Sequence, residues 1–222
     1  HALLALTSGA GNTAIGYQAG QVVTTGAYNT VLGYEAFDAA AVGESNNIAI
    51  GYDTMGAMDE GTSGGIDYNI AIGRSALKGA DYSTSSTVTS GNIAIGHFAM
   101  ESTGTNAHVG TTAIGYGALG ALTSGANNTV IGYQAGKLVT DGHNNVMIGH
   151  QAGDTARTGS AYNVVVGSGA FGGTHVTSDS DHCVAIGYLA MDGALNNVDG
   201  TIAIGSGALG ALTTGARNLA IG

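Results

Sequence analysis

A short motif recurs through the whole chain and constrains its fold more than any other feature of the sequence. The motif reads Asn, then Thr, Ile or Val, then Ala or Val, then Ile, Gly, often Tyr, any residue and Ala. The segment NTAIGYQAG at 12–20 returns almost unchanged as NTVIGYQAG at 128–136. Twelve copies cover the 222 residues, with motif glycines 17 to 23 residues apart. A period of this length is typical of solenoids, in which each repeat packs on its neighbours.

The motif positions vary little from one copy to the next. The residue before the motif glycine is Ile in ten of twelve copies, and the residue four before it is Asn in nine. Ala stands three residues after the glycine in ten of the eleven complete copies. We therefore expect these positions to be structural, foremost Asn12, Ile15, Gly16, Asn29, Gly33, Ile50, Gly51, Ile72, Gly73, Ile95, Gly96, Ile114, Gly115, Ile131, Gly132, Ile148, Gly149, Gly167, Ile186, Gly187, Ile204 and Gly205.

Each repeat predicts one short strand that ends in a bend. Segments such as NTAIG are rich in β-branched residues and end at a glycine, and 40 glycines in the chain disfavour helix. The sequence thus predicts an all-β fold, a parallel β-solenoid or β-roll of about twelve repeats of 17–23 residues. The Asn column is expected to satisfy turn backbone groups, and the motif glycine to allow a close approach or a conformation closed to other residues.

Alternation along the strand divides its side chains between two faces. Thr13 and Ile15 share one face, and Asn12 and Ala14 share the other. We expect the Ile ladders to fill the core, so that Ile131→Asp would place a charge in a buried column. Because both faces are largely apolar, both are expected to be covered, one by the coil itself and the other by a neighbouring chain.

Composition and charge exclude several classes of function. The chain has 15 acidic and 5 basic residues, a net charge of −10, which disfavours nucleic acid and anionic membranes as partners. No apolar run is long enough to insert in a membrane. We interpret residues 1–222 as a single repeat region. The start, HALLALTSGAGNTAIG, matches GALGALTSGANNTVIG at 117–132, so the chain is expected to be a fragment of a longer fibre protein.

The NTAIGYQAG and NIAIG units resemble the repeats of phage tail-fibre proteins that often end in an endosialidase-like intramolecular chaperone. They are also similar to the NSVAIG repeats of trimeric autotransporter (YadA-like) adhesin heads. The resemblance spans all twelve repeats, although the units here are longer and less regular than the adhesin unit. It implies that three chains intertwine or pack around a common axis as a homotrimer, in an elongated fibre that attaches to a surface.

The function implied is a structural segment of a trimeric phage-type tail fibre, which projects or presents a receptor-binding surface. The expected partners are the chain itself, further fibre segments or a tip domain, and a host glycan or protein. The location would be a virion tail fibre or a cell surface. Two alternatives stay open: a bacterial adhesin head that binds host matrix or glycans, and a monomeric ice- or surface-binding solenoid. The last would use an array formed by Thr13, Thr30, Thr112 and Thr129, which other repeats interrupt with Ile or Val.

Few residues indicate chemistry, and we expect neither enzymatic activity nor a cofactor, because the acidic residues are scattered over nonequivalent positions. Three loops are longer than the rest, near 59–67, 79–91 and 172–181, where either recognition or neutral insertion is expected. Cys183 stands at an Asn position and is interpreted as a small buried residue or an unpaired thiol. A weak metal-site candidate comprises His175, Asp179, Asp181 and His182.

Six tyrosines that follow the motif glycine are expected to form a partial column. Such a column is interpreted first as packing at a coil corner or between chains, and second as a surface on which sugar rings stack. These weak ligand-binding candidates are Tyr17, Tyr34, Tyr52, Tyr116, Tyr133 and Tyr188.

Overall fold

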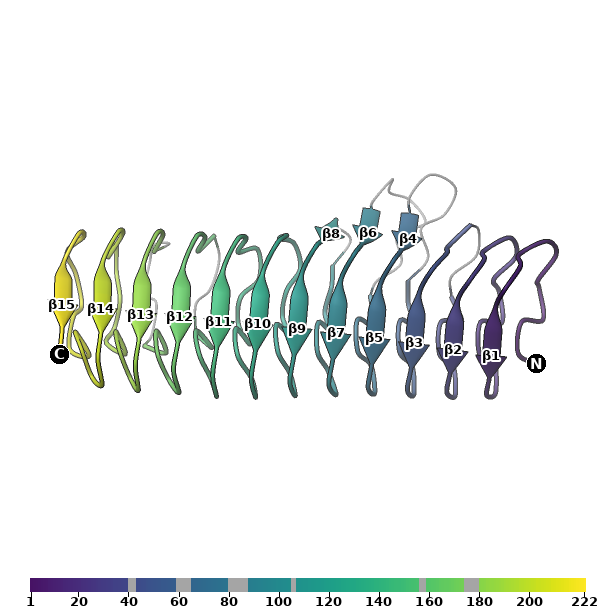
Figure 1. Cartoon of the computed structure of the whole chain (residues 1–222), viewed down its shortest axis with the longest axis horizontal. Coiled ribbons are helices and arrows are strands. Elements are labelled where there is room, and N and C mark those ends of the chain that lie inside the picture. The colour runs from purple at the N-terminus through teal and green to yellow at the C-terminus, as the bar shows by residue number, and fades with distance from the viewer. Residues whose placement is uncertain (40–42, 59–64, 80–87, 105–106, 156–158, 174–179) are drawn as a thin grey trace. The chain divides into compact units, whose positions relative to one another are not determined.

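The computed structural model is all-β and divides into two compact units, residues 1–111 and 112–222. It describes residues 1–39, 43–58, 65–79, 88–104, 107–155, 159–173 and 180–222. Each unit is a parallel β-solenoid in which one short strand per coil pairs with the strands of the adjacent coils (Figure 1). The predicted fold class is therefore confirmed.

The first unit contains two parallel sheets. Its main sheet runs in the order β1 (Thr13–Ile15), β2 (Thr30–Leu32), β3 (Ile48–Ile50), β5 (Ile70–Ile72) and β7 (Ile93–Ile95). A smaller sheet is formed by β4 (Gly65–Asp67), β6 (Val88–Ser90) and β8 (His108–Val109), in three consecutive coils that include the two longest repeats. Equivalent motif positions pair throughout the main sheet, as in Thr13 with Thr30 and Ile15 with Leu32.

The second unit contains one parallel sheet of seven strands. They follow the chain in order as β9 (Thr112–Ile114), β10 (Thr129–Ile131), β11 (Val146–Ile148), β12 (Val164–Val166), β13 (Val184–Ile186), β14 (Ile202–Ile204) and β15 (Leu219–Ile221). The register again pairs equivalent residues, for example Ile131 with Ile148. Because the register never slips, each motif position becomes a straight column of like side chains.

The two faces of the strands are oriented opposite to the prediction. The middle residue of each main-sheet strand points into the coil and is buried in every strand except β1 and β15. The first and third residues, including the motif Ile, point outward and are nowhere buried; Ile131 is 36% exposed and Ile15 61%. The expectation that the Ile ladders fill the core, with Ile131 in a buried column, is therefore wrong.

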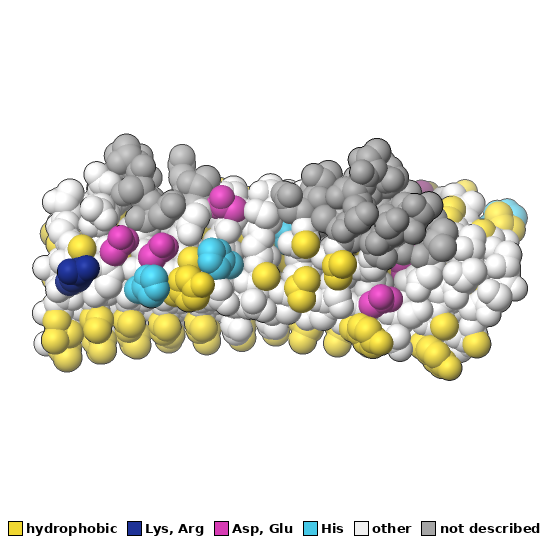
Figure 2. Space-filling view, turned by 90° about the horizontal axis from the view of Figure 1, so that it is seen from above, with side chains coloured by type: hydrophobic (Ala, Val, Ile, Leu, Met, Phe, Trp, Pro, Cys, Tyr) yellow, Lys and Arg dark blue, Asp and Glu magenta, His cyan; other side chains and the backbone are white. Residues whose placement is uncertain are grey.

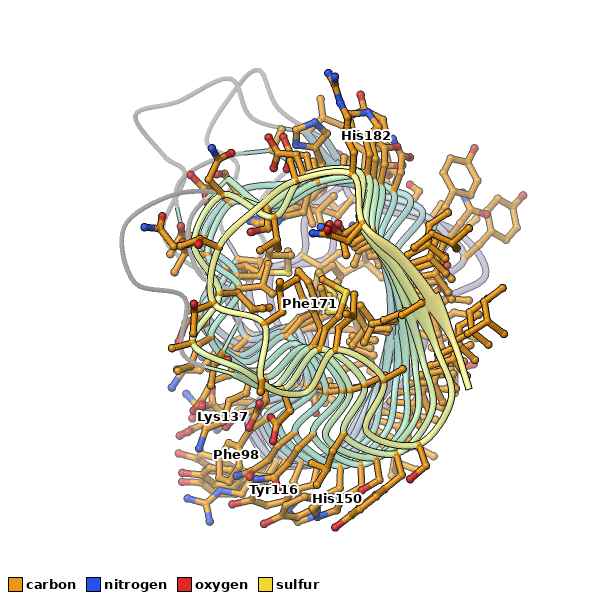
Figure 3. All side chains as sticks on the ribbon, turned by 90° about the vertical axis from the view of Figure 1, so that its left-hand side faces the viewer. Phe98, Tyr116, Lys137, His150, Phe171 and His182 are labelled. Carbon is orange, nitrogen blue, oxygen red and sulfur yellow. The ribbon has the colours of Figure 1, made fainter. Side chains whose placement is uncertain are left out.

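The core is filled instead from the opposite wall of the coil. The residue four after the motif glycine projects toward the strand, and Phe171 lies inside the coil in Figure 3. Where this residue is large, as Leu119 is, the facing middle residue is mostly Ala, as in Ala113. Where it is Gly153, a Cβ would collide with the thioether of Met147, which occupies that space. Core volume is thus shared between two columns, since a close-packed interior tolerates neither voids nor overlap.

The predicted asparagine column is confirmed as a hydrogen-bond ladder that joins Asn12 through to Asn92 in the first unit and Asn128 through to Asn163 in the second. Asn145 Nδ2 donates to Asn128 Oδ1 at 3.2 Å and to the Ser160 carbonyl at 2.8 Å. Asn145 Oδ1 accepts from the backbone N–H of Asn163 at 3.0 Å and from its Nδ2 at 3.2 Å. The same pattern joins Asn29, Asn47, Asn69 and Asn92 in the first unit. The ladder satisfies backbone groups that the turns would otherwise leave unpaired inside the protein.

The motif glycines meet both requirements expected of them. Their φ angles lie between +131° and +148°, and a Cβ on Gly132 would overlap the carbonyl oxygen of Gly149 in the next coil. The residue just before the Asn column is also left-handed in every coil, with φ between +58° and +70°. Gly or Asn occupies seven of these twelve positions, because these two residues adopt the left-handed conformation with little strain.

Candidate functional site

The outward face of the main-sheet strands is the most distinctive surface of the molecule. Twelve strands present 24 outward residues, of which 20 are Ile, Val or Leu and four are Thr; none is charged. Figure 2 shows these side chains as a row of apolar groups along the lower edge of the view. A flat, uncharged and partly exposed face of this kind is typical of an interaction surface rather than of ordinary solvent-exposed sheet.

The predicted tyrosine column exists as a stack of exposed rings at the end of the strands. In the first unit, Tyr17 and Tyr34 lie 5.1 Å apart between ring centroids, and Tyr34 and Tyr52 lie 5.5 Å apart. The interplanar angles are 21° and 12°. The pKa of Tyr34 is raised, chiefly by the negative charge of Glu35. These rings cover one another's faces and leave mainly their edges and hydroxyls to solvent.

The second unit has a column of the same kind, with a histidine in place of one tyrosine. Tyr116 stacks on Tyr133 at 5.4 Å, and Tyr133 stacks on His150 at 5.3 Å and 8°. The column then reaches Ser168, which has no ring, and Tyr188. The structure therefore confirms a coil-corner column, while its role in ligand binding stays a prediction.

Sequence reasoning missed how a non-aromatic residue takes part in this column. Arg74 follows the motif glycine of its coil, and its guanidinium lies 5.5 Å from the ring centroid of Tyr52 and 5.6 Å from that of Phe98. Arg74 therefore continues the stack by cation–π contact. The signal was present in the repeat alignment, because Arg74 stands where other copies have Tyr, but the part played by Phe98 requires the fold.

A second aromatic cluster lies on the residues that precede the Asn column. His182 stacks on Tyr162 at 5.0 Å and 11°, and His143 meets the same tyrosine edge-on at 5.3 Å. Tyr162 and His182 both adopt left-handed backbone angles, which are uncommon for such residues. The column position that Tyr162 and His182 share was readable from the repeat, but the ring contacts, including that of His143 two residues before its column Asn, were not.

The four candidate metal ligands do not form a described site. His175 and Asp179 lie outside the described residues. Asp181 Oδ1 accepts the backbone N–H of Ala161 at 2.7 Å, so this carboxylate has a turn-stabilising role. Among the residues that the structure describes, no group of three or more His, Cys, Asp or Glu side chains is placed to hold a metal ion.

Cys183 behaves as the predicted small buried residue. Its backbone N–H donates to Asn163 Oδ1 at 2.9 Å, and its Sγ donates to the Val198 carbonyl at 3.3 Å, as the column asparagines do with their amides. Burial raises the pKa of the thiol to about 11. Since the thiolate is the reactive form, this cysteine is suited to packing and not to nucleophilic chemistry.

A local charge cluster lies on the corner that follows the tyrosine column in the first unit. Lys78 Nζ forms an ion pair with Asp53 at 2.7 Å, and this contact raises the pKa of the lysine. Neighbouring Asp38 is half-buried, and burial, with the negative charges of Glu35 and Asp53, raises its pKa to about 6. The cluster makes this corner of the first unit sensitive to pH.

Comparison of the chain with protein-family models, curated proteins and solved structures gives no match. In the described portion of the chain, no helix has the length and hydrophobicity of a membrane span.

Proposed function

We propose that the chain is a structural segment of a trimeric fibre, in which the outward strand face of each copy packs against two others. The fibre projects or presents a surface that attaches to a receptor. The observation that carries this proposal is the outward strand face itself, which is uncharged in every coil of both units and apolar at 20 of its 24 positions.

The chemistry of this face favours a second copy of the chain as its cover. All 15 acidic residues lie off the outward positions, so copies can approach through this face with their charges directed elsewhere. Like columns of Ile, Val and Leu on each copy repeat at the same coil spacing, so their ridges match in register. The likeness of the NTAIGYQAG unit to repeats of trimeric fibres and adhesin heads favours three copies over two.

The size of the face is comparable with the largest apolar patches on monomers and smaller than a standard interface. A three-residue strand in a stacked sheet has a footprint of roughly 10 Å by 4.8 Å. Seven such strands give about 340 Å² in the second unit, and five give about 240 Å² in the first. Isolated apolar patches on monomers reach roughly 300–600 Å² in total, and stable interfaces bury about 800 Å² per partner. Side chains that project from a flat sheet add to these footprints.

The test is the solution mass of the 222-residue chain, measured by analytical ultracentrifugation. We expect three times 21.7 kDa. Ile131→Lys should lower the mass, because it places a charge on the outward strand face. Leu138→Lys is the matched control: Leu138 is equally exposed at 38%, against 36% for Ile131, but lies on the returning part of the coil.

A monomeric wild-type chain would overturn the proposal, and an independent solenoid with a free binding face would replace it. Equal loss of mass in both variants would place the contact outside the strand face. If both variants kept the trimer mass, the contact would likewise lie outside the strand face.

A further inference from the structure

Tyr188 differs from the other rings of the tyrosine column. Tyr34 has a ring on either side and is 47% exposed, whereas Tyr17 has one stacked neighbour and is 54% exposed. Tyr188 is 59% exposed, and no other ring contacts it among the described residues. Its flanking column positions are Ser168 and Ser206. Both faces of this ring are therefore open, unlike those of the stacked tyrosines.

The position at Ser168 is bounded by a ring on each side. The backbone is in register there: Gly169 N–H donates to the His150 carbonyl at 2.9 Å, and Leu189 N–H donates to the Ser168 carbonyl at 3.0 Å. His150 is stacked on Tyr133 through one face, so its other face is directed along the column toward Ser168. The Ser168 side chain is exposed, and its hydroxyl has no partner in the part of the chain that the structure describes.

The width of this ring-free position admits one ring-sized group. Two coil steps separate His150 and Tyr188, about 9.6 Å along the column. A flat group placed midway would lie about 4.8 Å from each neighbour, close to the spacing of the stacked rings elsewhere in the column. A pyranose chair is thicker, because its axial hydrogens project from both faces, and it can contact both rings at once. In the first unit the ring-free position next to Tyr52 is filled by the column's own Arg74, whose guanidinium lies over the rings of Tyr52 and Phe98, whereas Ser168 has no side chain long enough to do this.

We propose that the ring-free position at Ser168 binds one pyranose ring of a glycan. The two faces of the sugar stack on His150 and Tyr188, and the Ser168 hydroxyl bonds a sugar hydroxyl. A neutral sugar is favoured, because the chain has a net charge of −10 and the same two coils carry Asp154 and Asp192. This site gives the fibre a receptor class that the proposed function leaves open.

The site is compatible with a fibre but does not require one. In Figure 3, His150 projects from the base of the coil, while the outward strand side chains project from its right-hand side. Copies that pack through the strand face therefore leave the column at their rim, and a trimer would carry the site three times. Glycan binding and oligomeric mass can be measured on the same samples, so failure of one proposal is distinguishable from failure of the other.

The experiment is saturation-transfer NMR on the 222-residue chain, with methyl glycosides of β-glucose, β-galactose and α-mannose as separate probes. We expect transfer to at least one probe. Ser168→Tyr closes the position with a ring and should weaken that binding about tenfold or more, since stacking contributes on both faces. Ser206→Tyr is the matched control, because it adds the same ring to the same column but covers only the other face of Tyr188. It should leave affinity within about twofold.

Three results would overturn the inference: no transfer to any of the probes, loss with Ser206→Tyr but not Ser168→Tyr, or retention by both variants. If Ser168→Tyr does not reach the wild-type melting temperature, His150→Ser and Tyr188→Ser replace it, because serine already occupies this column position in two coils. Each should then weaken binding, and full binding by both would reject the site.

Discussion

The inward and outward columns of the same strands follow opposite rules. Inward, the middle residue ranges from Ala113 through Val130 to Met147, and the residue facing it across the coil changes in compensation. Outward, the residue before the motif glycine is Ile in all but two coils. A column whose partner lies in the same chain can vary, because the partner can vary with it. A column that stays uniform although it is exposed favours the proposal that its partner lies outside the coil.

The comparison also explains why polar and apolar groups share the interior. The Asn ladder occupies the inward side beside small Ala and Val residues, and its rungs are paired with backbone and with neighbouring Asn residues, as Asn145 is. Burial of an amide without partners would cost more than burial of a methyl group gains. The fold therefore places its hydrogen-bonding groups inside and its largest β-branched residues outside.

The largest expected effect separates the two columns directly. Val130→Asp places a charge in the fully buried inward column and should destabilise the chain by more than about 4 kcal/mol, which abolishes the cooperative unfolding transition of the surrounding coils. Ile131→Asp, one residue further on, should preserve the β circular-dichroism signal and lower only the oligomeric mass. Denaturant unfolding and sedimentation on both variants check this.

If Ile131→Asp instead lost the β signal as fully as Val130→Asp, the strand face would be needed for each coil to fold. The separation between an inner column that stabilises the coil and an outer column that joins chains would then be wrong.

The next effect tests whether the ladder belongs with the inward column. Asn145→Ala removes the acceptor of two bonds from Asn163 and the donor to Ser160, and it should cost about 3 kcal/mol, because buried partners are left unpaired. Asn144→Gly is its neighbour and control, since Asn144 is left-handed and Gly suits that conformation. Guanidinium unfolding should show a large loss of stability for Asn145→Ala and none for Asn144→Gly. Equal losses in both variants would show that the Asn ladder does not stabilise the coil.

Because the two facing columns share the core volume, substitutions in both of them should have non-additive effects on stability. Met147→Ala should cost about 2–3 kcal/mol by leaving a cavity. Gly153→Leu alone should also destabilise, because the new side chain meets the Met147 thioether. Together they recreate the arrangement of Ala113 with Leu119, so the double variant should recover about 1–2 kcal/mol relative to the sum. A double-mutant cycle by thermal unfolding measures this, and strict additivity would show that the two columns do not share volume.

The repeat made the period, the register and the Asn and Gly columns predictable, because each depends on spacing alone. It did not reveal which strand face points inward. Both faces are apolar, and Ile15 is larger than Ala14, so size favoured the wrong side. The residues that fill the core opposite the strand, such as Phe37, Met55 and Leu77, differ from repeat to repeat. A motif of recurring residues therefore does not include them. The buried, hydrogen-bonded Asn on the same face as Ala was the signal that indicates the correct direction.

The candidate site was predictable to a similar depth. The tyrosine column follows from the repeat alignment, since one position per coil stacks along the solenoid. Its consequences depend on neighbours in space: rings cover one another at Tyr34 but not at Tyr188, and Arg74 continues the stack with help from Phe98. Such contacts join residues in different coils and at different motif positions, which one-dimensional alignment does not relate.

The smallest expected effect concerns the charge cluster on the corner that follows the tyrosine column of the first unit. There Asp38 is half-buried and its pKa is raised to about 6. A carboxyl has a pKa of about 3.9 in an unfolded chain, so between about pH 4 and pH 6 the folded state holds more protons than the unfolded state. The free energy of unfolding should therefore fall as pH rises through this window.

Asp38→Asn removes this titration while keeping the shape of the side chain. It should stabilise the chain by about 1 kcal/mol at pH 7, a figure reduced for partial exposure, and should have no effect near pH 4. Urea unfolding of both proteins at pH 4, 5, 6 and 7 measures the difference. Glu35→Gln is the companion variant: loss of a nearby negative charge should move the fall in stability to lower pH. A difference between wild type and Asp38→Asn that stayed constant with pH, or grew toward pH 4, would show that the corner carboxyl is not the group responsible.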